Sequence, residues 1–139
     1  MSIVVDTSVW SLSLRRKPSG LNETERAIVN ELTQLIAEGH VRLLGIVRQE
    51  ILSGLRAPAQ FERLRSVLRV FPDTEVGIPD HESAAQISNQ FHAKGITISV
   101  VDAFICAAAL NRDWAIFTMD SDFKLLAGTV SIKLHSPRK

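Results

Sequence analysis

Two aspartates stand directly after apolar runs that predict buried strands. Asp6 ends the run in VVDTSVW, and Asp120 follows WAIFT, within the hexapeptide TMDSDF. In α/β proteins, ligands bind at the carboxyl ends of the strands. If these two strands are neighbours in a parallel sheet, both carboxylates should face one crevice.

Two further acids, Asp102 and Glu50, are candidates for the same crevice. With Ser99 as the N-cap of a helix, Asp102 takes the third helical position, at the positive end of the helix dipole. It is either a solvent-facing capping residue or, because apolar residues surround it, a carboxylate that needs a cation as partner. Glu50, in VRQEILSGL, is by itself most simply a surface glutamate at the rim of an apolar helix face.

Several carboxylates in one crevice repel one another, and a divalent cation removes that cost. A ligand set made of oxygen alone, with no His or Cys cluster, favours Mg²⁺ or Mn²⁺ over Zn²⁺. Such an ion keeps bound water and suits hydrolysis at phosphorus. A fifth acid, Asp122, either supports this set from behind or caps the turn before Phe123, and we favour the cap.

Short apolar strands and helices alternate along the chain. Strands are predicted at residues 2–5, 41–44, 75–78, 115–118 and 130–134. Helices are predicted from residue 8, over 22–39, along Val47, Ile51 and Leu55, from Pro58, from an Asp80 cap to Gly95, and from a Ser99 cap through Leu110. This alternation predicts an α/β fold with a central parallel sheet covered by helices on both faces.

Bulk composition predicts one cytoplasmic globular domain over residues 1–139. The chain contains 45% hydrophobic residues, a formal net charge of +1 and one cysteine, Cys106, which cannot form an intramolecular disulfide. No window approaches the length of a membrane span. Charge alone does not indicate a nucleic-acid binder, but three basic clusters stand out, and each is most simply a solvated surface. They are Arg15-Arg16-Lys17, the set Arg56, Arg63, Arg65 and Arg69, and Arg138-Lys139.

Four motifs in order resemble one known family. They are VVDTSVW, RQEILSG, GITISVVDAFICAAAL and IFTMDSDF, and together they cover nearly the whole chain. In these motifs the sequence resembles the PIN-domain ribonucleases, in particular the VapC-type toxins of toxin–antitoxin pairs. The resemblance implies a three-layer α/β sandwich and, often, a homodimer.

The resemblance also implies a site and an activity. Asp6, Glu50, Asp102 and Asp120 would gather around one or two Mg²⁺ or Mn²⁺ ions, with direct ligation expected from the three aspartates. Thr7 or Ser8 would orient a ligand, and Thr118 would support Asp120. The implied reaction is endonucleolytic cleavage of structured RNA, such as tRNA or rRNA, to 5′-phosphate and 3′-hydroxyl ends. The implied partner is a small antitoxin protein.

Three positive residues, Arg15, Arg16 and Lys17, follow Asp6 closely and could reach RNA phosphates beside such a site. Two other Mg²⁺-binding folds fit poorly. A phosphotransfer receiver domain needs an acidic pair after the first strand, and a haloacid-dehalogenase-like phosphatase needs a second aspartate where Ser8 stands. The alternative that stays open is a catalytically silent PIN-like binding module, whose acids only stabilise the fold.

Overall fold

The apolar runs form a four-stranded parallel sheet in the computed structural model, which describes residues 1–139. The order across the sheet is β2-β1-β3-β4. The strands are β1 (Ile3–Val5), β2 (Val41–Arg42), β3 (Ala115–Phe117) and β4 (Lys133–Leu134). Because β1 and β3 pair directly, with Val5 beside Phe117, the carboxyl ends of these two strands are adjacent, as the site prediction requires.

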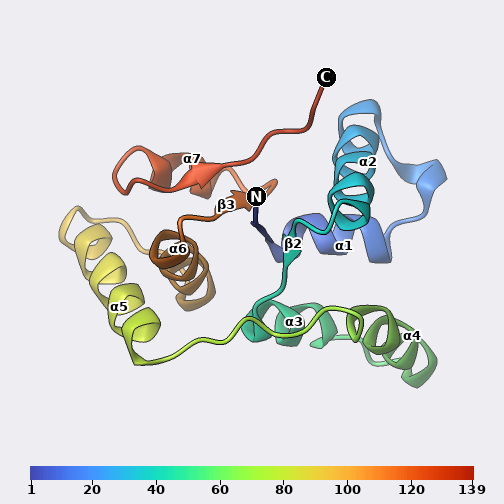
Figure 1. Ribbon diagram of the computed structural model, residues 1–139, viewed down its shortest axis with the longest axis horizontal. Coiled ribbons are helices and arrows are strands. Elements are labelled where there is room, and N and C mark those ends of the chain that lie inside the picture. Colours follow the sequence, from blue (N-terminus) through green and yellow to red (C-terminus); the bar gives the residue numbers. More distant parts are fainter.

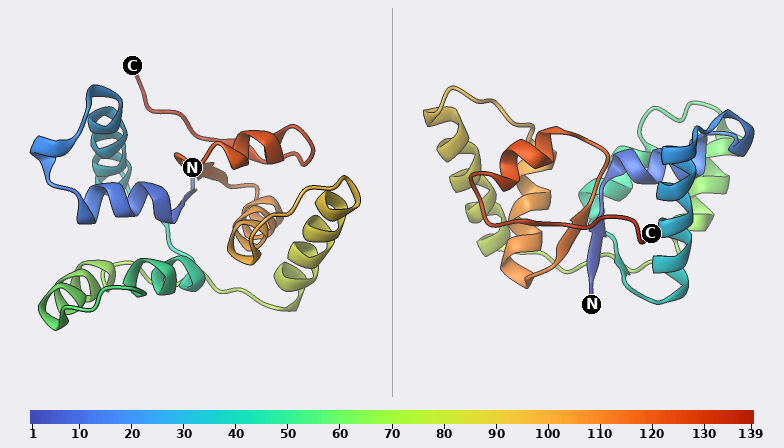
Figure 2. Two further views of the ribbon diagram at one scale, coloured as in Figure 1. Left: turned by 180° about the vertical axis from the view of Figure 1, so that it is seen from behind. Right: turned by 90° about the horizontal axis from the view of Figure 1, so that it is seen from above.

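Helices cover both faces of the sheet, and the predicted three-layer α/β sandwich is confirmed. In Figures 1 and 2, α5, α6 and α7 lie on one side of the sheet and α1 and α2 on the other, while α3 and α4 lie next to the edge strand β2. The helices are α1 (Thr7–Arg15), α2 (Glu23–Ala37), α3 (Gly45–Leu52), α4 (Pro58–Leu68), α5 (Ile78–Ala93), α6 (Val100–Arg112) and α7 (Asp122–Ala127), with a 3-10 turn at Pro18–Gly20.

The core forms between the sheet and the helices packed on it. All three residues of β1 are fully buried, and so is α6 from Ala103 to Ala109, where small side chains let the helix approach the sheet. The prediction that α6 is buried all round is wrong for its first turn, where Val100 is 82% exposed. The helix therefore begins at an open edge of the sheet, and Asp102 stands on that edge.

The predicted helix ends are mostly confirmed by their hydrogen bonds. The Asn22 side chain accepts from the amide of Glu25, and the Glu25 side chain accepts from the amide of Asn22. Ser99 accepts from the amide of Asp102 at 3.0 Å, so Asp102 does occupy the third position of α6. Gly95 follows α5 with a φ of +76°, a conformation that glycine adopts without strain.

Two predictions around the start of α5 are wrong. Residues 75–77 are exposed and irregular rather than a strand, and Ile78 already belongs to the helix because Pro79 favours a first helical turn. Asp80 is therefore not the cap but the third helical residue. Its side chain accepts from the amide of Gly77 at 3.0 Å and forms a bidentate ion pair with Arg112 of α6.

Two other boundaries also differ. Helix α3 ends at Leu52, so Leu55 lies outside it; Gly54 has a φ of +86° and turns the chain there. Helix α7, which begins at Asp122 within TMDSDF, is absent from the sequence-based prediction, and the last strand is shorter than the predicted residues 130–134. None of the helices is both long and apolar enough to cross a membrane.

Candidate active site

Asp6 lies at the carboxyl end of β1 and is the N-cap residue of α1, with only 4% of its surface exposed. Its Oδ2 atom accepts hydrogen bonds from Ser8 Oγ and Thr118 Oγ1, each at 2.8 Å. Its Oδ1 atom has no hydrogen-bond partner in the protein, and it is not sealed from solvent, since the one sealed side-chain polar atom without a partner belongs to Trp10. Asp6 therefore has one oxygen fixed by hydroxyls and one free to bind a cation.

Asp120 is held beside Asp6 by the same hydroxyl groups. The amide of Asp120 donates to Thr118 Oγ1 at 3.0 Å, and the amide of Met119 donates to Ser8 Oγ at 3.1 Å. Asp6 and Asp120 therefore share a hydroxyl network that ties the end of β3 to the start of α1. This network explains why both Ser8 and Thr118 follow strand ends in the sequence.

Asp122 contacts Asp120 through its backbone, because its amide donates to Asp120 Oδ1 at 2.9 Å. It is the first residue of α7, one position after the N-cap Ser121, so its charge lies at the positive end of that helix. Its side chain also lines a small pocket of about 140 Å³ together with Ser99 and Asp102.

Asp102 experiences the combined field of the other acids. Burial raises the pKa of its carboxyl group to about 6, and the negative charges of Asp6, Asp120 and Glu50 contribute in the same direction, while hydrogen bonding to Ser99 acts in the opposite one. The four predicted acids are therefore brought within electrostatic reach of one another, from β1, α3, α6 and the end of β3.

Glu50 reaches this group from α3. The hydroxyl of Thr7, the first residue of α1, donates to Glu50 Oε1. The simplest sequence interpretation, an isolated surface glutamate, is therefore incomplete: Glu50 is exposed, but it is hydrogen-bonded to the residue next to Asp6. Thr7 thus orients Glu50, while Ser8 orients Asp6.

The donor set fits a hard divalent cation, although no three Asp, Glu, His or Cys side chains are grouped closely enough to hold an ion as they stand. Carboxylates near one another disfavour each other's charged form, a cost that a bound cation removes. A bound cation would give Oδ1 of Asp6 a partner, and it would stabilise the charged form of Asp102, whose pKa is raised in its absence. The oxygen-only set is one that Mg²⁺ or Mn²⁺ takes.

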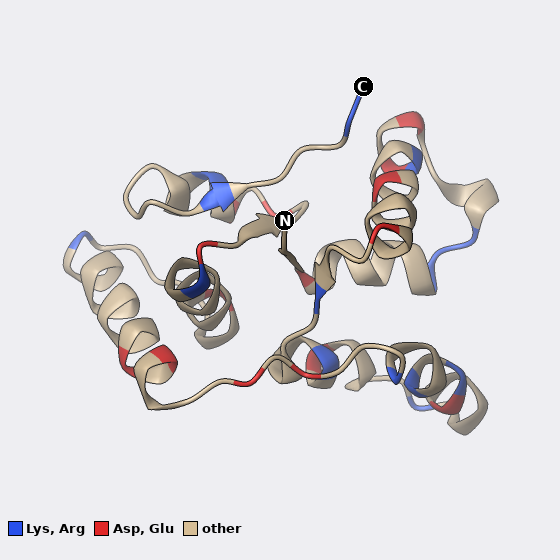
Figure 3. Ribbon diagram, viewed as in Figure 1, with Lys and Arg blue, Asp and Glu red and all other residues tan.

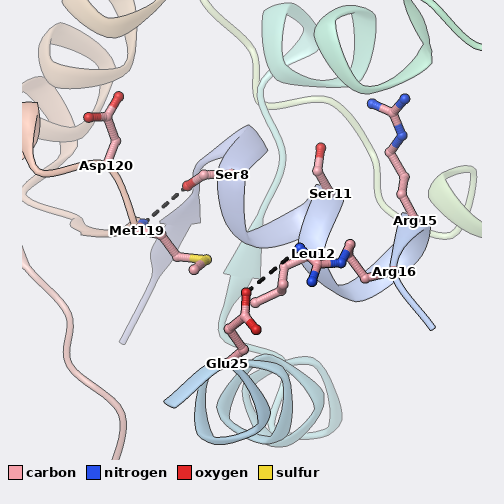
Figure 4. Close-up of a pocket in the computed structure, with 8 residues that line it drawn as sticks. All are labelled: Ser8, Ser11, Leu12, Arg15, Arg16, Glu25, Met119 and Asp120. Carbon is pink, nitrogen blue, oxygen red and sulfur yellow. Dashed lines mark hydrogen bonds and ion pairs between the residues drawn. The ribbon is translucent and has the colours of Figure 1, made fainter. Parts of the chain in front are cut away.

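A pocket of about 680 Å³ opens beside the acids (Figure 4). Asp120 and Ser8 line one end of it, and Arg15 and Arg16 line the other, as the sequence suggested; Lys17 does not line it. Sequence reasoning missed the other lining residues, which are Ser11, Leu12, Glu25 and Met119. The sequence identifies Glu25 only as a helix-capping residue, which it also is, and Arg16 lies 3.8 Å from its carboxylate.

A comparison with protein-family models matches residues 3–128 to the PIN domain. The chain belongs to the PIN domain family. A comparison with curated protein sequences finds no match. The family predicted from the four motifs is thus confirmed, and the match spans all four acids.

Solved structures share the fold over nearly the full length. A chain of FitAcB from Neisseria gonorrhoeae superposes with a TM-score of 0.75 at 26% identity, covering 97% of each chain. A chain of VapBC2 from Rickettsia felis, solved bound to a DNA fragment from the promoter, gives a TM-score of 0.77 at 16% identity and covers 97% of this chain and 98% of its own. VapBC-1 from nontypeable Haemophilus influenzae gives 0.74 at 15% identity over 100% of both chains. VapC-type PIN domains are generally nucleases, and PIN-domain nucleases generally use divalent metals.

Proposed function

We propose that this PIN domain is an Mg²⁺- or Mn²⁺-dependent endoribonuclease that acts as the toxin of a toxin–antitoxin pair. The observation that carries the proposal is the convergence of four carboxylates, seen in the raised pKa of Asp102. The negative charge of these carboxylates repels an RNA phosphate unless a cation lies between them. An acid cluster that served only to stabilise the fold would be expected to contain cationic side chains, and the ion pairs of this chain lie elsewhere. They join Arg16 to Glu25, Arg48 to Asp73, Arg65 to Glu62, Arg112 to Asp80, Lys133 to Asp113, His135 and Arg138 to Glu31, and Arg138 to Glu38.

In the proposed mechanism, Asp6, Asp102 and Asp120 would hold the divalent ion. A bound ion of this kind lowers the pKa of water and neutralises charge on the scissile phosphate. Glu50, oriented by Thr7, accepts a hydrogen bond or a proton from the attacking water. Ser8 and Thr118 keep Asp6 in the orientation that presents Oδ1. Attack in line with the leaving 3′-oxygen gives a 5′-phosphate and a 3′-hydroxyl.

The proposed substrate is structured RNA such as tRNA or rRNA, and Arg15 and Arg16 support it. They line the opposite end of the same pocket from Asp120, so an RNA strand that reaches the acid group can place another of its phosphates on them. Lys17, next along the chain, adds positive charge without lining the pocket. Contacts of this kind bind phosphate without reading sequence.

A small antitoxin protein and a second copy of this chain are the proposed protein partners. The neighbours FitAcB and VapBC support the first, since these structures pair a chain of this fold with another protein. Homodimer formation rests on the family resemblance. An antitoxin that covers the pocket would explain how a cell tolerates the nuclease.

One observation favours the alternative of a silent PIN-like binding module: no three acids are close enough to hold an ion as they stand. The test is to map new 5′-phosphate RNA ends in cells after brief induced expression, with Asp102→Asn as the inactive control and Asp122→Asn as the matched acidic control. The nuclease predicts a few sharp ends with wild type and Asp122→Asn, and none with Asp102→Asn. The absence of new ends with folded wild-type protein, or the same ends with Asp102→Asn, would favour the binding module.

A further inference from the structure

Helix α4 and its flanks concentrate positive charge on one part of the surface. Residues 53–72 contain four arginines and one acid, Glu62, so this segment has a net charge of +3. The whole chain has a net charge of only +1, so the remaining residues together carry −2. Figure 3 shows positively charged residues along α4, at the far end of the helix pair α3–α4. The four arginines of this segment are Arg56 just before the helix, Arg63 and Arg65 within it, and Arg69 at its C-cap.

Most of this charge is not neutralised within the protein. Arg56, Arg63 and Arg69 are exposed and their side chains have no hydrogen-bond or ion-pair partner, whereas Arg65 is paired with Glu62 at 2.6 Å. Unpaired arginines are suited to phosphate because their planar guanidinium groups donate in a fixed fork. Two exposed apolar side chains, Val67 and Val70, lie among them. A face used only for solubility would carry acids of balancing charge, as most surfaces do.

The helix is also rigidly placed. Leu64 and Leu68 of α4 are fully buried against the rest of the protein, so the opposite face of the helix is exposed to solvent. Arg48 of α3 donates to the carbonyl oxygens of Leu68 at 3.0 Å and of Phe71, and to the carboxylate of Asp73 at 2.8 Å. The C-terminal end of α4 is therefore fixed to the helix that carries Glu50, so a ligand on α4 keeps a defined relation to the site.

Helix α4 continues the positive surface of the pocket. Figures 1 and 2 place α4 beside the C-terminal end of α1, where Arg15 lies. Trp10 of α1 packs edge-on against Phe71, just beyond α4, with ring centroids 5.3 Å apart. An RNA strand that leaves the acid group along Arg15 therefore approaches the arginines of α4.

We propose that the exposed face of α4 is an RNA-backbone exosite, at which Arg56, Arg63 and Arg69 bind phosphates remote from the scissile one. The inference rests on the proposed nuclease function. The four acids have no cationic side chain among them, so side-chain contacts that bind RNA phosphates must come from positive charge outside that site. A duplex or folded RNA can span both surfaces, whereas a very short RNA cannot. The exosite therefore selects for larger, structured RNA.

The test compares a charge-removal variant with a matched control. Arg56→Gln/Arg63→Gln/Arg69→Gln removes three charges from α4, and Lys94→Gln/Lys133→Gln/Lys139→Gln removes three exposed charges elsewhere. Both are made in the Asp102→Asn background to prevent cleavage. Binding of unfractionated tRNA and of a tetranucleotide RNA is measured by fluorescence anisotropy over a range of salt concentrations.

The exosite predicts that the α4 variant binds tRNA at least tenfold more weakly and that its salt slope falls by about 2 to 3, the value for three lost phosphate contacts. Tetranucleotide binding should not change, and the lysine control should retain most of its tRNA affinity. The exosite would be overturned if the protein with unchanged α4, the α4 variant and the lysine control bound tRNA with equal affinity and equal salt slope. It would also be overturned if the α4 variant lost tetranucleotide binding as much as it lost tRNA binding.

Two further measurements separate this inference from its premise. Mn²⁺ affinity, measured with Asp102 restored, should be unchanged by the α4 substitutions; a loss would show that α4 acts by positioning α3, and would overturn the exosite. If the protein with Asp102 neither binds Mn²⁺ nor cleaves RNA, the nuclease proposal fails. A selective loss of tRNA binding in the α4 variant would still support α4 as an RNA-binding surface.

Discussion

The hydroxyl of Thr118 donates to Oδ2 of Asp6 at 2.8 Å and accepts from the amide of Asp120 at 3.0 Å. One threonine thus links two acids that come from opposite ends of the chain. Asp6 does not depend on Thr118 alone for its position, because the hydroxyl of Ser8 also donates to its carboxylate. The role of Thr118 is to set the orientation of the Asp6 carboxylate relative to Asp120.

Thr118→Val should lower RNA cleavage and Mn²⁺ affinity by about 10- to 100-fold, the usual effect of removing a hydrogen bond that orients a metal ligand. The change keeps the side-chain shape and removes only the hydroxyl. Thr118→Ser is the matched control and should retain most activity. The prediction is checked by cleavage kinetics and by Mn²⁺ titration, and near-wild-type values for Thr118→Val would contradict it.

Asp102 should make the metal-free protein less stable at neutral pH than at mildly acidic pH. Because burial and neighbouring acids raise its pKa from 3.8 to about 6, the folded state binds this proton more tightly than the unfolded state. The contribution of Asp102 to stability therefore falls as pH rises from about 4 to 6 and stays low above that range. In EDTA, Asp102→Asn should be more stable than wild type at pH 7.5.

The expected gain is about 1–2 kcal/mol, reduced from the full value of the pKa shift because Asp102 retains solvent contact. Urea unfolding at pH 4 and pH 7.5 measures it, and the gain should nearly vanish at pH 4. Asp73→Asn, at an exposed carboxylate paired with Arg48, is the control and should show no such gain. A variant equal to or less stable than wild type at pH 7.5 would count against the clustering of the acids.

Asp120 and Asp122 should differ sharply in their effect on activity. Asp120 belongs to the hydroxyl network of Asp6, whereas Asp122 contacts it only by donating its amide to Asp120. Asp120→Asn should reduce cleavage by at least 100-fold, and Asp122→Asn, which keeps that amide, by less than about tenfold. Initial-rate measurements with saturating Mg²⁺ decide this, and equal losses would assign a ligand role to Asp122 as well.

Asp80 and Arg112 should matter for stability and not for catalysis. The Asp80 carboxylate is buried, is paired with Arg112 at 2.7 and 2.8 Å, and also accepts from Asn111 at 2.9 Å. Asp80→Ala should destabilise the fold by about 3 kcal/mol, since it leaves a largely buried guanidinium without its partner. The remaining folded fraction should keep wild-type cleavage per molecule, and a selective loss of activity at full stability would contradict this division.

The same pair has a predictable pH dependence. Hydrogen bonding from Arg112 holds the pKa of Asp80 well below its usual value of 3.8. The ion pair therefore contributes fully above about pH 5, and its contribution is lost as the pH falls below the unfolded pKa. Urea unfolding followed by circular dichroism should show that the stability difference between wild type and Asp80→Asn is largest near neutral pH and shrinks below about pH 4. A difference that stays constant across this range would contradict the assigned cause.

The fold was largely predictable because its strands are short apolar runs that alternate with helices. Asp6 and Asp120 could be placed at strand ends from these runs, the pairing of β1 with β3 makes those ends adjacent, and Ser99 fixed the helical position of Asp102 through its capping bond. The prediction for Glu50 had less support from the residues alone, because no sequence pattern indicates its hydrogen bond to Thr7, which joins α3 to α1. The sequence offered Glu50 as a candidate at the rim of an apolar helix face, and the family resemblance implied its place among the four acids.

Other features depended on tertiary contacts that local patterns do not encode. The stretch 75–78 has strand-like residues, but it lies exposed where Pro79 starts a helix. Asp80 resembles a cap in the sequence because its partner, Arg112, is more than thirty residues away. The pocket residues Ser11 and Leu12 lie outside the four motifs, and Met119 has no assigned role within its motif; only the packing of α1 against the end of β3 brings them together.

The most direct test of the central claim is Mn²⁺ binding to the purified protein, measured by isothermal titration calorimetry together with Mg²⁺-dependent cleavage of cellular RNA. We expect Mn²⁺ binding in the micromolar to millimolar range, lost in both Asp6→Asn and Asp102→Asn and kept in Asp122→Asn, with cleavage lost in the same two variants. Folded wild-type protein that binds no Mn²⁺, or Asp6→Asn and Asp102→Asn proteins that bind and cleave as wild type does, would contradict it.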